Sequence, residues 1–428
     1  MTEKLLTKIR SKKAMVGIVG VGYVGEALGT AINDAGFKIT GFEKNREKIS
    51  ELRNRLPANF ELTTDKNLLT NCDIICICVP TPLKGEGAPD YSILTTAVRE
   101  VSLKLRAGQF ISIESSVSPG TTRNIILPIL NTSGLVIEKD FFLGYSPERV
   151  DPGNSQYKVK NIPKVVSGIG VNSNLIANEF YRRIVEITVP VSSCETAEMT
   201  KVLENVFRLI NISLVNELAD YARGAGINIW EVINTAATKP FGFLAHYPGP
   251  GAGGYCIPVL PEFLLADARK KGVDLPLVAT AASANRKQPE KVAKMALKIM
   301  NGPAKASLNG VKTVNGQKNG NGHTPQALII GIGYKEGVAD TRESVALKIW
   351  EKMENNGVKV HYHDPYVKKL NGSKSQELAH KFLKKMDVII VATAHKNISY
   401  ETLLSVNKPL FDTKNALANY KSANIYKL

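Results

Sequence analysis

A glycine-rich turn lies between an apolar segment and a helical segment near the start of the chain. Residues 15–20 (MVGIVG) have the composition of a strand, and residues 22–36 place apolar side chains on one helical face. Gly20 allows a tight turn, and Gly25 allows the helix to pack closely on the strand. The pattern predicts a strand–turn–helix unit of a parallel sheet.

The same turn is suited to a dinucleotide. Gly22 lets the backbone approach a pyrophosphate, which would lie at the N-terminal end of the helix, where free N–H groups point outward. Glu43 closes the second strand (FKITGFE) about twenty residues further on, where a carboxylate binds ribose hydroxyls and repels a 2′-phosphate. We therefore predict NAD rather than NADP, although Lys44 and Arg46 leave a 2′-phosphate site as the alternative.

Strand and helix patterns alternate through much of the chain. The first half continues with DIICICVP and QFISIESSV, and the pattern restarts with ALIIGIGY, VKVHYHDP, MDVIIVATAH and KPLFDTKN. Alternation of this kind predicts an α/β protein with a doubly wound parallel sheet. We expect an N-terminal Rossmann domain, a central long-helix domain and a smaller C-terminal Rossmann-like domain. The predicted bounds are 1–192 for the NAD-binding domain, 193–301 for the central dimerisation and catalytic region, 302–326 for a flexible insertion rich in Gly, Asn and Lys, and 327–428 for the C-terminal UDP-sugar-binding domain.

Charge indicates small anionic ligands. The 428 residues carry a formal net charge of +16, with 43% hydrophobic and 22% charged residues. The positive residues are spread along the chain, and no basic stripe interleaved with aromatic residues is present, so nucleic acid is not expected as a partner. The alternative is a solvated lysine-rich surface.

The five cysteines do not suggest a disulfide framework or a metal site. Their number is odd and the chain is long, and Cys72, Cys76 and Cys78 lie in or beside an apolar run that reads as a buried strand. The N-terminal residues do not resemble a signal peptide, and no apolar run reaches membrane-spanning length. We therefore expect a cytoplasmic protein with no membrane partner and no bound metal.

Cys256 lies in a different context, within PGPGAGGYCIP. The glycines let ligand atoms approach the backbone, and a thiol in such a loop is a better nucleophile than one in a strand. The chemistry requires a nearby cation that favours the thiolate. A structural cysteine remains the alternative.

Several ordered segments resemble the UDP-glucose/GDP-mannose dehydrogenase family. They are GVGYVG, VPTP at 79–82, ESSVSPGTT at 114–122, GYSPER at 144–149, AEMTKVLENVFRLINISLVNELA at 197–219, TKPFGF at 238–243, the Cys256 loop and GIGYKEGVADTRES at 331–344. The resemblance covers nearly the whole chain apart from the insertion. It is strongest to the branch that oxidises UDP-N-acetylglucosamine or UDP-N-acetylmannosamine at C6.

The resemblance implies two hydride transfers to NAD⁺, with Cys256 forming a thiohemiacetal and then a thioester that water hydrolyses to a uronic acid. It implies that Lys201 is the cation near the substrate oxygen and that Asn205, one helical turn later, helps to hold the oxyanion or a water. A solvated helix face is the alternative reading of this pair. Glu148 matches an acid/base residue, and Ser116 stands where the family usually has threonine.

The resemblance also assigns binding residues. The cofactor set is Gly20, Gly22, Tyr23, Val24, Gly25, Glu43, Pro80, Thr81 and Ser116, and the substrate set is Arg149, Lys201, Asn205, Gly253, Lys335 and Arg342. Surface charge is the alternative for Lys335 and Arg342. The long helical pattern from about 195 to 224 implies at least a homodimer.

Two residues of the Cys256 loop depart from the family pattern. Tyr255 replaces a histidine, and Leu260 replaces an aspartate that is counted among the catalytic groups; Glu262 lies two positions further on. Loss of one cooperating group typically costs orders of magnitude in rate. The sequence therefore leaves open a UDP-glucose 6-dehydrogenase, a single-step dehydrogenase that does not need Cys256, and a catalytically impaired homologue that binds NAD and a UDP-sugar.

Overall fold

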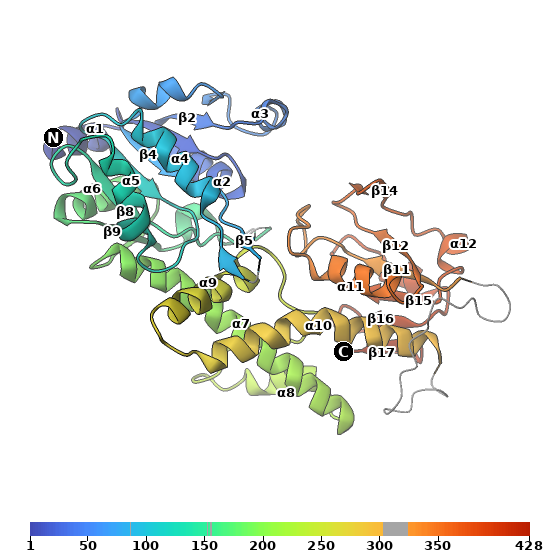
Figure 1. Cartoon of the computed structure of the whole chain (residues 1–428). Coiled ribbons are helices and arrows are strands. Elements are labelled where there is room, and N and C mark those ends of the chain that lie inside the picture. Colours follow the sequence, from blue (N-terminus) through green and yellow to red (C-terminus); the bar gives the residue numbers. More distant parts are fainter. Residues whose placement is uncertain (86, 152, 155, 303–323) are drawn as a thin grey trace. The chain divides into compact units, whose positions relative to one another are not determined.

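The computed structural model describes residues 1–85, 87–151, 153–154, 156–302 and 324–428 (Figure 1). The chain forms two compact units, which are described separately. Unit 1 contains Met1–Asn205 and Glu262–Asp274, and unit 2 contains Val206–Pro261 and Leu275–Leu428. The predicted insertion at 302–326 falls almost entirely on 303–323, outside the described residues.

Unit 1 is built on an eight-stranded sheet in the order β10-β9-β8-β7-β4-β1-β2-β3 (Figure 1). The strands are β1 Met15–Val19, β2 Lys38–Phe42, β3 Phe60–Thr63, β4 Ile74–Ile77, β7 Phe110–Ile113, β8 Phe142–Tyr145, β9 Lys164–Gly168 and β10 Thr188–Pro190. The predicted strands at 15–20, in FKITGFE, in DIICICVP and in QFISIESSV are confirmed. Their carboxyl ends meet at one edge of the sheet, where ligands bind in folds of this kind.

The prediction of a parallel sheet is wrong at one pair. β8 and β9 run antiparallel, whereas the other neighbouring strands are parallel. A parallel pair needs a crossover of a dozen or more residues, usually a helix. The described part of the β8–β9 connection contains the short 3₁₀ helix η3 Val159–Asn161 and no longer helix that could serve as a crossover.

Helices cover both faces of this sheet, because strand side chains alternate between the faces. Val16 and Ile18 belong to one core cluster, with side chains of α1 Thr2–Arg10, α2 Tyr23–Asp34 and α6 Val171–Tyr181. Ile75 and Ile77 belong to the other. The remaining elements here are α3 Arg46–Arg53, η1 Lys66–Asn71, α4 Ser92–Ser102, η2 Thr122–Ile126, α5 Leu127–Asn131 and the hairpin of β5 Leu83–Lys84 and β6 Ala88–Pro89.

The strand cysteines are core residues, as predicted. Cys76 lies in β4 and Cys72 and Cys78 flank it, and all three are buried. They fill the interior as small apolar side chains.

Unit 2 contains a smaller parallel sheet in the order β12-β11-β15-β16-β17. The strands are β11 Gln326–Ile330, β12 Lys359–His363, β15 Val388–Val391, β16 Leu410–Asp412 and β17 Ile425–Lys427; around them lie α11 Val345–Glu354, α12 His380–Leu383, α13 Tyr400–Leu404 and the hairpin of β13 Lys369–Leu370 and β14 Ser373–Lys374. Two clusters again occupy the two faces of the sheet. The second α/β block is confirmed.

Long helices account for most of the central region. They are α7 Cys194–Gly224, α8 Ile229–Ala236, α9 Cys256–Lys270 and α10 Pro276–Met300. The long helix predicted at about 195–224 is therefore confirmed. The unit boundaries fall within α7, after Asn205, and within α9, after Pro261.

Candidate functional site

The glycine turn after β1 has the geometry predicted for close packing of α2 on β1 and for approach of a pyrophosphate to the backbone. Gly20 has φ +89°, a conformation that favours glycine. A Cβ atom added at Gly25 would lie 2.2 Å from the Gly20 carbonyl oxygen, so α2 packs against the turn too closely for any side chain. Among the described residues, apart from the immediate chain neighbours, none has an atom within 4 Å of a Cβ added at Gly22, so the N-terminal end of α2 has room for a phosphate group. Tyr23 is exposed and Val24 is half-buried beside it.

Glu43 lies at the end of β2 and is held in place. Its carboxylate accepts a hydrogen bond from the Asn45 N–H at 3.3 Å and pairs with the Lys48 ammonium at 2.6 Å. Lys48 thus pairs with Glu43, whereas the alternative prediction of a 2′-phosphate site concerns Lys44 and Arg46.

The loops after β4 and β7 are tied together at the same edge of the sheet. Thr81 donates its hydroxyl to the Ser116 carbonyl oxygen at 2.6 Å, and Ser115 donates to the Val79 carbonyl oxygen at 2.7 Å. Ser116 is half-buried, and its hydroxyl makes no hydrogen bond within the described ranges, whereas Pro80 is exposed. The Ser116 hydroxyl is therefore available to a ligand or a water.

Lys201 and Asn205 lie on α7 and are both buried, with 9% and 4% exposure, rather than on a solvated face. Lys201 donates from Nζ to the Glu148 carbonyl oxygen, and Asn205 donates to the Lys201 carbonyl oxygen at 2.9 Å. Arg149 is engaged elsewhere, since it pairs with Glu204 at 2.7 Å and donates to the Pro163 carbonyl oxygen. Unit 1 thus brings Lys201, Asn205 and Glu148 together.

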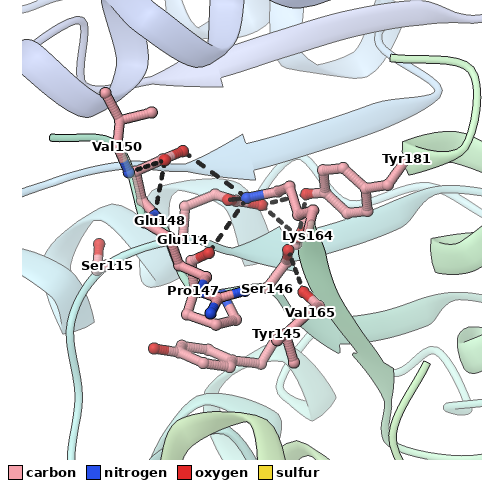
Figure 2. Close-up of polar contacts among 12 residues, drawn as sticks. Glu114, Ser115, Tyr145, Ser146, Pro147, Glu148, Val150, Lys164, Val165 and Tyr181 are labelled. Atoms are coloured by element: carbon pink, nitrogen blue, oxygen red, sulfur yellow. Dashed lines mark hydrogen bonds and ion pairs between the residues drawn. The ribbon is translucent and has the colours of Figure 1, made fainter. Parts of the chain in front are cut away.

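A buried charge cluster that sequence reasoning missed adjoins Glu148 (Figure 2). Lys164, on β9, donates to Glu114 at 2.9 Å and lies 3.7 Å from a Glu148 carboxylate oxygen. Glu114 also accepts hydrogen bonds from Ser112 and from the Tyr181 hydroxyl. The available signal was a charged residue inside each of two apolar strand patterns, in ISIES and in PKVVSG.

Glu198, on α7, secures the loop that follows β7. Its carboxylate accepts hydrogen bonds from the Gly120 N–H, the Thr122 N–H and the Thr122 hydroxyl, and its side chain is fully buried. Burial raises the pKa of Glu198 to about 7, although these hydrogen bonds act in the opposite direction.

We expect the Glu198→Gln variant to lose a pH dependence of stability. Because the folded pKa of Glu198 lies above its ordinary value, its contribution is complete at low pH and is lost as the pH rises through about 7. The free energy of unfolding of the unaltered protein should fall by on the order of 1–3 kcal/mol between about pH 5 and pH 8, and the variant should lack this decline. Urea unfolding across that pH range measures it. Glu195→Gln, in the same helical turn, should retain the decline; an unchanged decline in Glu198→Gln would exclude this source.

Cys256 is half-buried and is the first residue of α9, where the helix dipole favours negative charge. Buried side-chain amides from α7 and α10 hold the loop before it. Asn216 accepts from the Gly249 N–H at 2.8 Å, Gln288 donates to the Gly249 carbonyl oxygen at 3.0 Å, and Asn285 exchanges two hydrogen bonds with Ala252. Neutral side-chain amides thus fix the backbone of the loop at Gly249 and Ala252.

The Cys256 loop lies against the segment that follows β11, in the same unit. Gly254 has φ +82°, and its missing Cβ would lie 2.7 Å from the Tyr334 ring. A Cβ at Gly253 would lie 2.9 Å from the Glu343 carbonyl oxygen. The Arg342 guanidinium lies 5.7 Å from the centre of the Tyr255 ring, so the residue that replaces the family histidine contacts a residue of the predicted substrate set.

A buried acid supports the segment that carries Lys335. Asp364 accepts from the Ile332 and Gly333 N–H groups and pairs with His395 at 3.3 Å, and the Gly337 N–H donates to the other ring nitrogen of His395. Although burial acts to raise it, the pKa of Asp364 lies well below its usual range because His395 and backbone N–H groups donate to the carboxylate. Lys335 is half-buried on this segment, and Arg342 is exposed and paired with Asp340.

Leu260 and Glu262 differ in their surroundings. Leu260 has 0% exposure. Glu262 belongs to unit 1, where its carboxylate oxygen would lie 3.0 Å from a Cβ added at Gly87, between β5 and β6. The Glu262 side chain is therefore directed at this hairpin.

The described residues contain no group of three or more His, Cys, Asp or Glu side chains arranged to hold a metal ion. Among the described helices, none is long and apolar enough to cross a membrane.

Sequence profiles of one family match three successive parts of the chain. They are the NAD binding domain (52–186), the central domain (195–287) and the UDP binding domain (328–419) of the UDP-glucose/GDP-mannose dehydrogenase family. A profile of coenzyme F420-dependent NADP oxidoreductases also matches residues 15–84, around the glycine turn.

Similar proteins are nucleotide-sugar dehydrogenases. The chain is 29% identical to a UDP-N-acetyl-D-mannosamine dehydrogenase of Pyrococcus horikoshii, over 91% of this chain and 92% of that one. It is 30% identical to a UDP-N-acetyl-D-glucosamine 6-dehydrogenase of Pseudomonas aeruginosa, over 96% and 99%. A solved structure of the Pyrococcus horikoshii UDP-D-ManNAc dehydrogenase superposes with a TM-score of 0.83 at 27% identity, covering 96% of this chain and 98% of that one.

Proposed function

The chain belongs to the UDP-glucose/GDP-mannose dehydrogenase family, and on this premise we propose that it oxidises the C6 alcohol of a UDP-N-acetylhexosamine to the uronic acid. The observation that carries the proposal is Cys256, a half-buried thiol at the first residue of α9, in a loop fixed against the segment that carries Lys335 and Arg342. Both relatives named above are UDP-N-acetylhexosamine dehydrogenases, which supports this substrate class.

The cofactor is NAD, and the glycine turn has the space that it requires. The open position above Gly22 and the Glu43 carboxylate at the end of β2 fit a pyrophosphate and a ribose respectively. Bound NAD⁺ supplies the hydride acceptor in each of the two oxidations. Tyr23, Val24, Thr81 and the Ser116 hydroxyl, with Pro80, complete the proposed cofactor set.

The chain's own residues carry the remaining chemistry. Lys201 and Asn205 stabilise negative charge on the C6 oxygen. The Cys256 thiolate attacks the aldehyde carbon to form a C–S bond, and the π electrons of the C=O bond move to the C6 oxygen. Loss of a hydride from the same carbon, for which bound NAD⁺ would be the acceptor, then gives a thioester. Glu148 then takes a proton from the attacking water as the C–S bond breaks and Cys256 leaves as the thiolate. Ser116 helps to hold that water, and Arg149, Gly253, Lys335 and Arg342 complete the substrate set.

The test is the number of NADH molecules formed per sugar, with UDP-N-acetylglucosamine, UDP-N-acetylmannosamine and UDP-glucose in parallel and mass spectrometry of the protein alongside. The proposal expects two NADH per sugar with repeated turnover on an N-acetylhexosamine. Turnover on UDP-glucose alone would identify the UDP-glucose 6-dehydrogenase, and one NADH per sugar would identify a single-step enzyme.

A second candidate, a catalytically impaired homologue, is favoured by Leu260. A buried leucine cannot accept a proton or orient a water at the position of the family aspartate, and Glu262 is directed at the hairpin instead. This candidate expects either a burst of NADH followed by a stalled Cys256 adduct, or ligand binding with no NADH.

We further propose a homodimer through α7. Phe207, Leu214, Leu218 and Tyr221 recur at helical spacing on one face and are all at least 44% exposed in the single chain. The Leu218→Glu variant should therefore shift the protein toward the monomer in sedimentation velocity. Leu103→Glu, at an 82% exposed leucine outside this face, should leave the assembly unchanged. A Leu218→Glu protein that sediments as the unaltered protein does would exclude this interface.

A further inference from the structure

The Glu148 carboxylate has one satisfied oxygen and one free oxygen. Oε1 accepts hydrogen bonds from the Arg149 and Val150 N–H groups at 2.7 and 2.8 Å. Oε2 is buried and has no hydrogen-bond partner within the described ranges, and the side chain as a whole is 10% exposed. A buried charged oxygen is costly unless a cation or a donor compensates it.

Lys164 is the cation in position to compensate this oxygen. Its Nζ lies 3.7 Å from Glu148 Oε2 and donates to Glu114 Oε2 at 2.9 Å, and its side chain is only 5% exposed (Figure 2). Lys164 therefore lies between two carboxylates. It donates a hydrogen bond to Glu114 and interacts with Glu148 only across the longer distance.

Other titratable groups face Glu148 from the elements around it. Lys201, on α7, donates to the Glu148 backbone carbonyl oxygen rather than to its carboxylate. Arg149 is paired with Glu204. Among the described residues, Tyr23 from α2 and Cys78 after β4 also interact electrostatically with Glu148, and Asp151 acts on the same Tyr23. Tyr181 from α6 acts through Glu114.

The pKa values of Glu114 and Lys164 are both raised above their ordinary values. Burial raises the pKa of Glu114 above its ordinary value, despite Lys164 and Tyr181. Burial acts to lower the pKa of Lys164, but the charges of Glu114 and Glu148 outweigh it, and the pKa of Lys164 is raised. Lys164 thus stays charged, and the two carboxylates share its attraction.

We propose that Lys164 is a positioning residue that keeps the Glu148 carboxylate charged and oriented, and that Glu114 sets how much of the Lys164 charge Glu148 receives. The inference rests on the proposed function of Glu148 as the base at the thioester step. A charged Glu148 carboxylate can accept the proton of the attacking water, whereas a protonated one cannot.

The proposal expects two substitutions to act in opposite directions. In Lys164→Met, Glu148 loses its cation, so the acidic limb of the kcat–pH profile should move up by about one pH unit or more. In Glu114→Gln, Lys164 is released to Glu148, so the limb should move down. If Lys164 and Glu114 had only a structural role, both variants would lose activity, and the acidic limb would not move in opposite directions.

Two further variants keep the test decisive. Lys164→Arg retains the positive charge, so its acidic limb should lie closer to that of the unaltered protein than the limb of Lys164→Met does. Glu114→Gln/Lys164→Met removes both members of the 2.9 Å pair and should fold better than Lys164→Met. Because one charge of each sign is lost, its acidic limb should lie between those of the two single variants. A double variant whose limb lies outside that interval would overturn the proposal.

A readout that does not need turnover separates this inference from the proposed function. The protonated-carboxyl band in the infrared difference spectrum between each protein and its Glu148→Gln counterpart reports the titration of Glu148 directly. Opposite shifts in Lys164→Met and Glu114→Gln would support the inference even if no sugar yielded NADH, which would reject only the function. Absent or parallel shifts would overturn the inference even in an active enzyme.

Discussion

Replacement of Cys256 by alanine is expected to lower the rate of uronic acid formation by about 10³-fold or more, since no thioester can form. Any residual reaction should stop at the aldehyde, with no more than one NADH per sugar. The other thiols cannot substitute, because burial raises the pKa of Cys72 and of Cys194 to about 12 and raises those of Cys76 and Cys78 as well. Absorbance of NADH with mass spectrometry of the sugar product measures the effect.

The matched control is Cys194→Ala, which removes a buried thiol at the first residue of α7. It should retain two NADH per sugar and a rate within about threefold of the unaltered protein. Two NADH per sugar from Cys256→Ala would show that the thioester does not form on this thiol, and the mechanism would have to be abandoned.

The second large effect is expected at the glycine turn. In Gly25→Ala the new Cβ would lie 2.2 Å from the Gly20 carbonyl oxygen, so α2 must move away from β1. We expect a loss of about 3 kcal/mol in the free energy of unfolding and a weakening of NAD binding by about 100-fold or more, because the N-terminal end of α2 is displaced. Urea unfolding and calorimetric titration with NAD measure the two effects.

Gly22→Ala separates the two effects. Gly22 has φ −88°, which any residue adopts, and no described residue beyond its chain neighbours has an atom within 4 Å of its added Cβ. Stability should therefore change by less than about 0.5 kcal/mol, whereas NAD binding should still weaken because the methyl group occupies the pyrophosphate approach. If Gly25→Ala were as stable as Gly22→Ala, tight packing of α2 on the turn would not be its role.

Sequence patterns predicted an element correctly where its structure depends on residues close together in the sequence. The turn from β1 to α2 follows from three glycines, and α7 follows from apolar spacing across 31 residues. The alternation of buried strands with helices gave the two α/β blocks for the same reason. These features depend on neighbours in the sequence.

Features that depend on distant partners were not predictable in the same way. The antiparallel β8–β9 pair depends on how the chain returns between the strands, and no local pattern distinguishes it from a parallel pair. The spacing of Lys201 and Asn205 placed them on one helical face but did not show that this face is buried. The ion pair of Glu43 with Lys48 likewise depends on the fold and was not predicted.

The family resemblance indicated Glu148 but not the groups that surround it. Glu114 and Lys164 are 50 positions apart in the sequence, and only the fold brings them together. Charged residues inside strands are rare unless they are paired, so two such residues in apolar strand patterns were a usable signal that the sequence reading did not apply.

The pairing of Glu114 with Lys164 also constrains how this protein can diverge. Exchange of Lys164 alone leaves the fully buried Glu114 carboxylate without its cation, at a typical cost of about 3–5 kcal/mol, whereas exchange of Glu114 leaves Lys164 facing Glu148. That cost is a large part of the stability of an ordinary domain, so exchange of Lys164 alone is a poor evolutionary intermediate. We therefore expect descendants of this sequence that lose the lysine at position 164 to have lost the glutamate at position 114 as well.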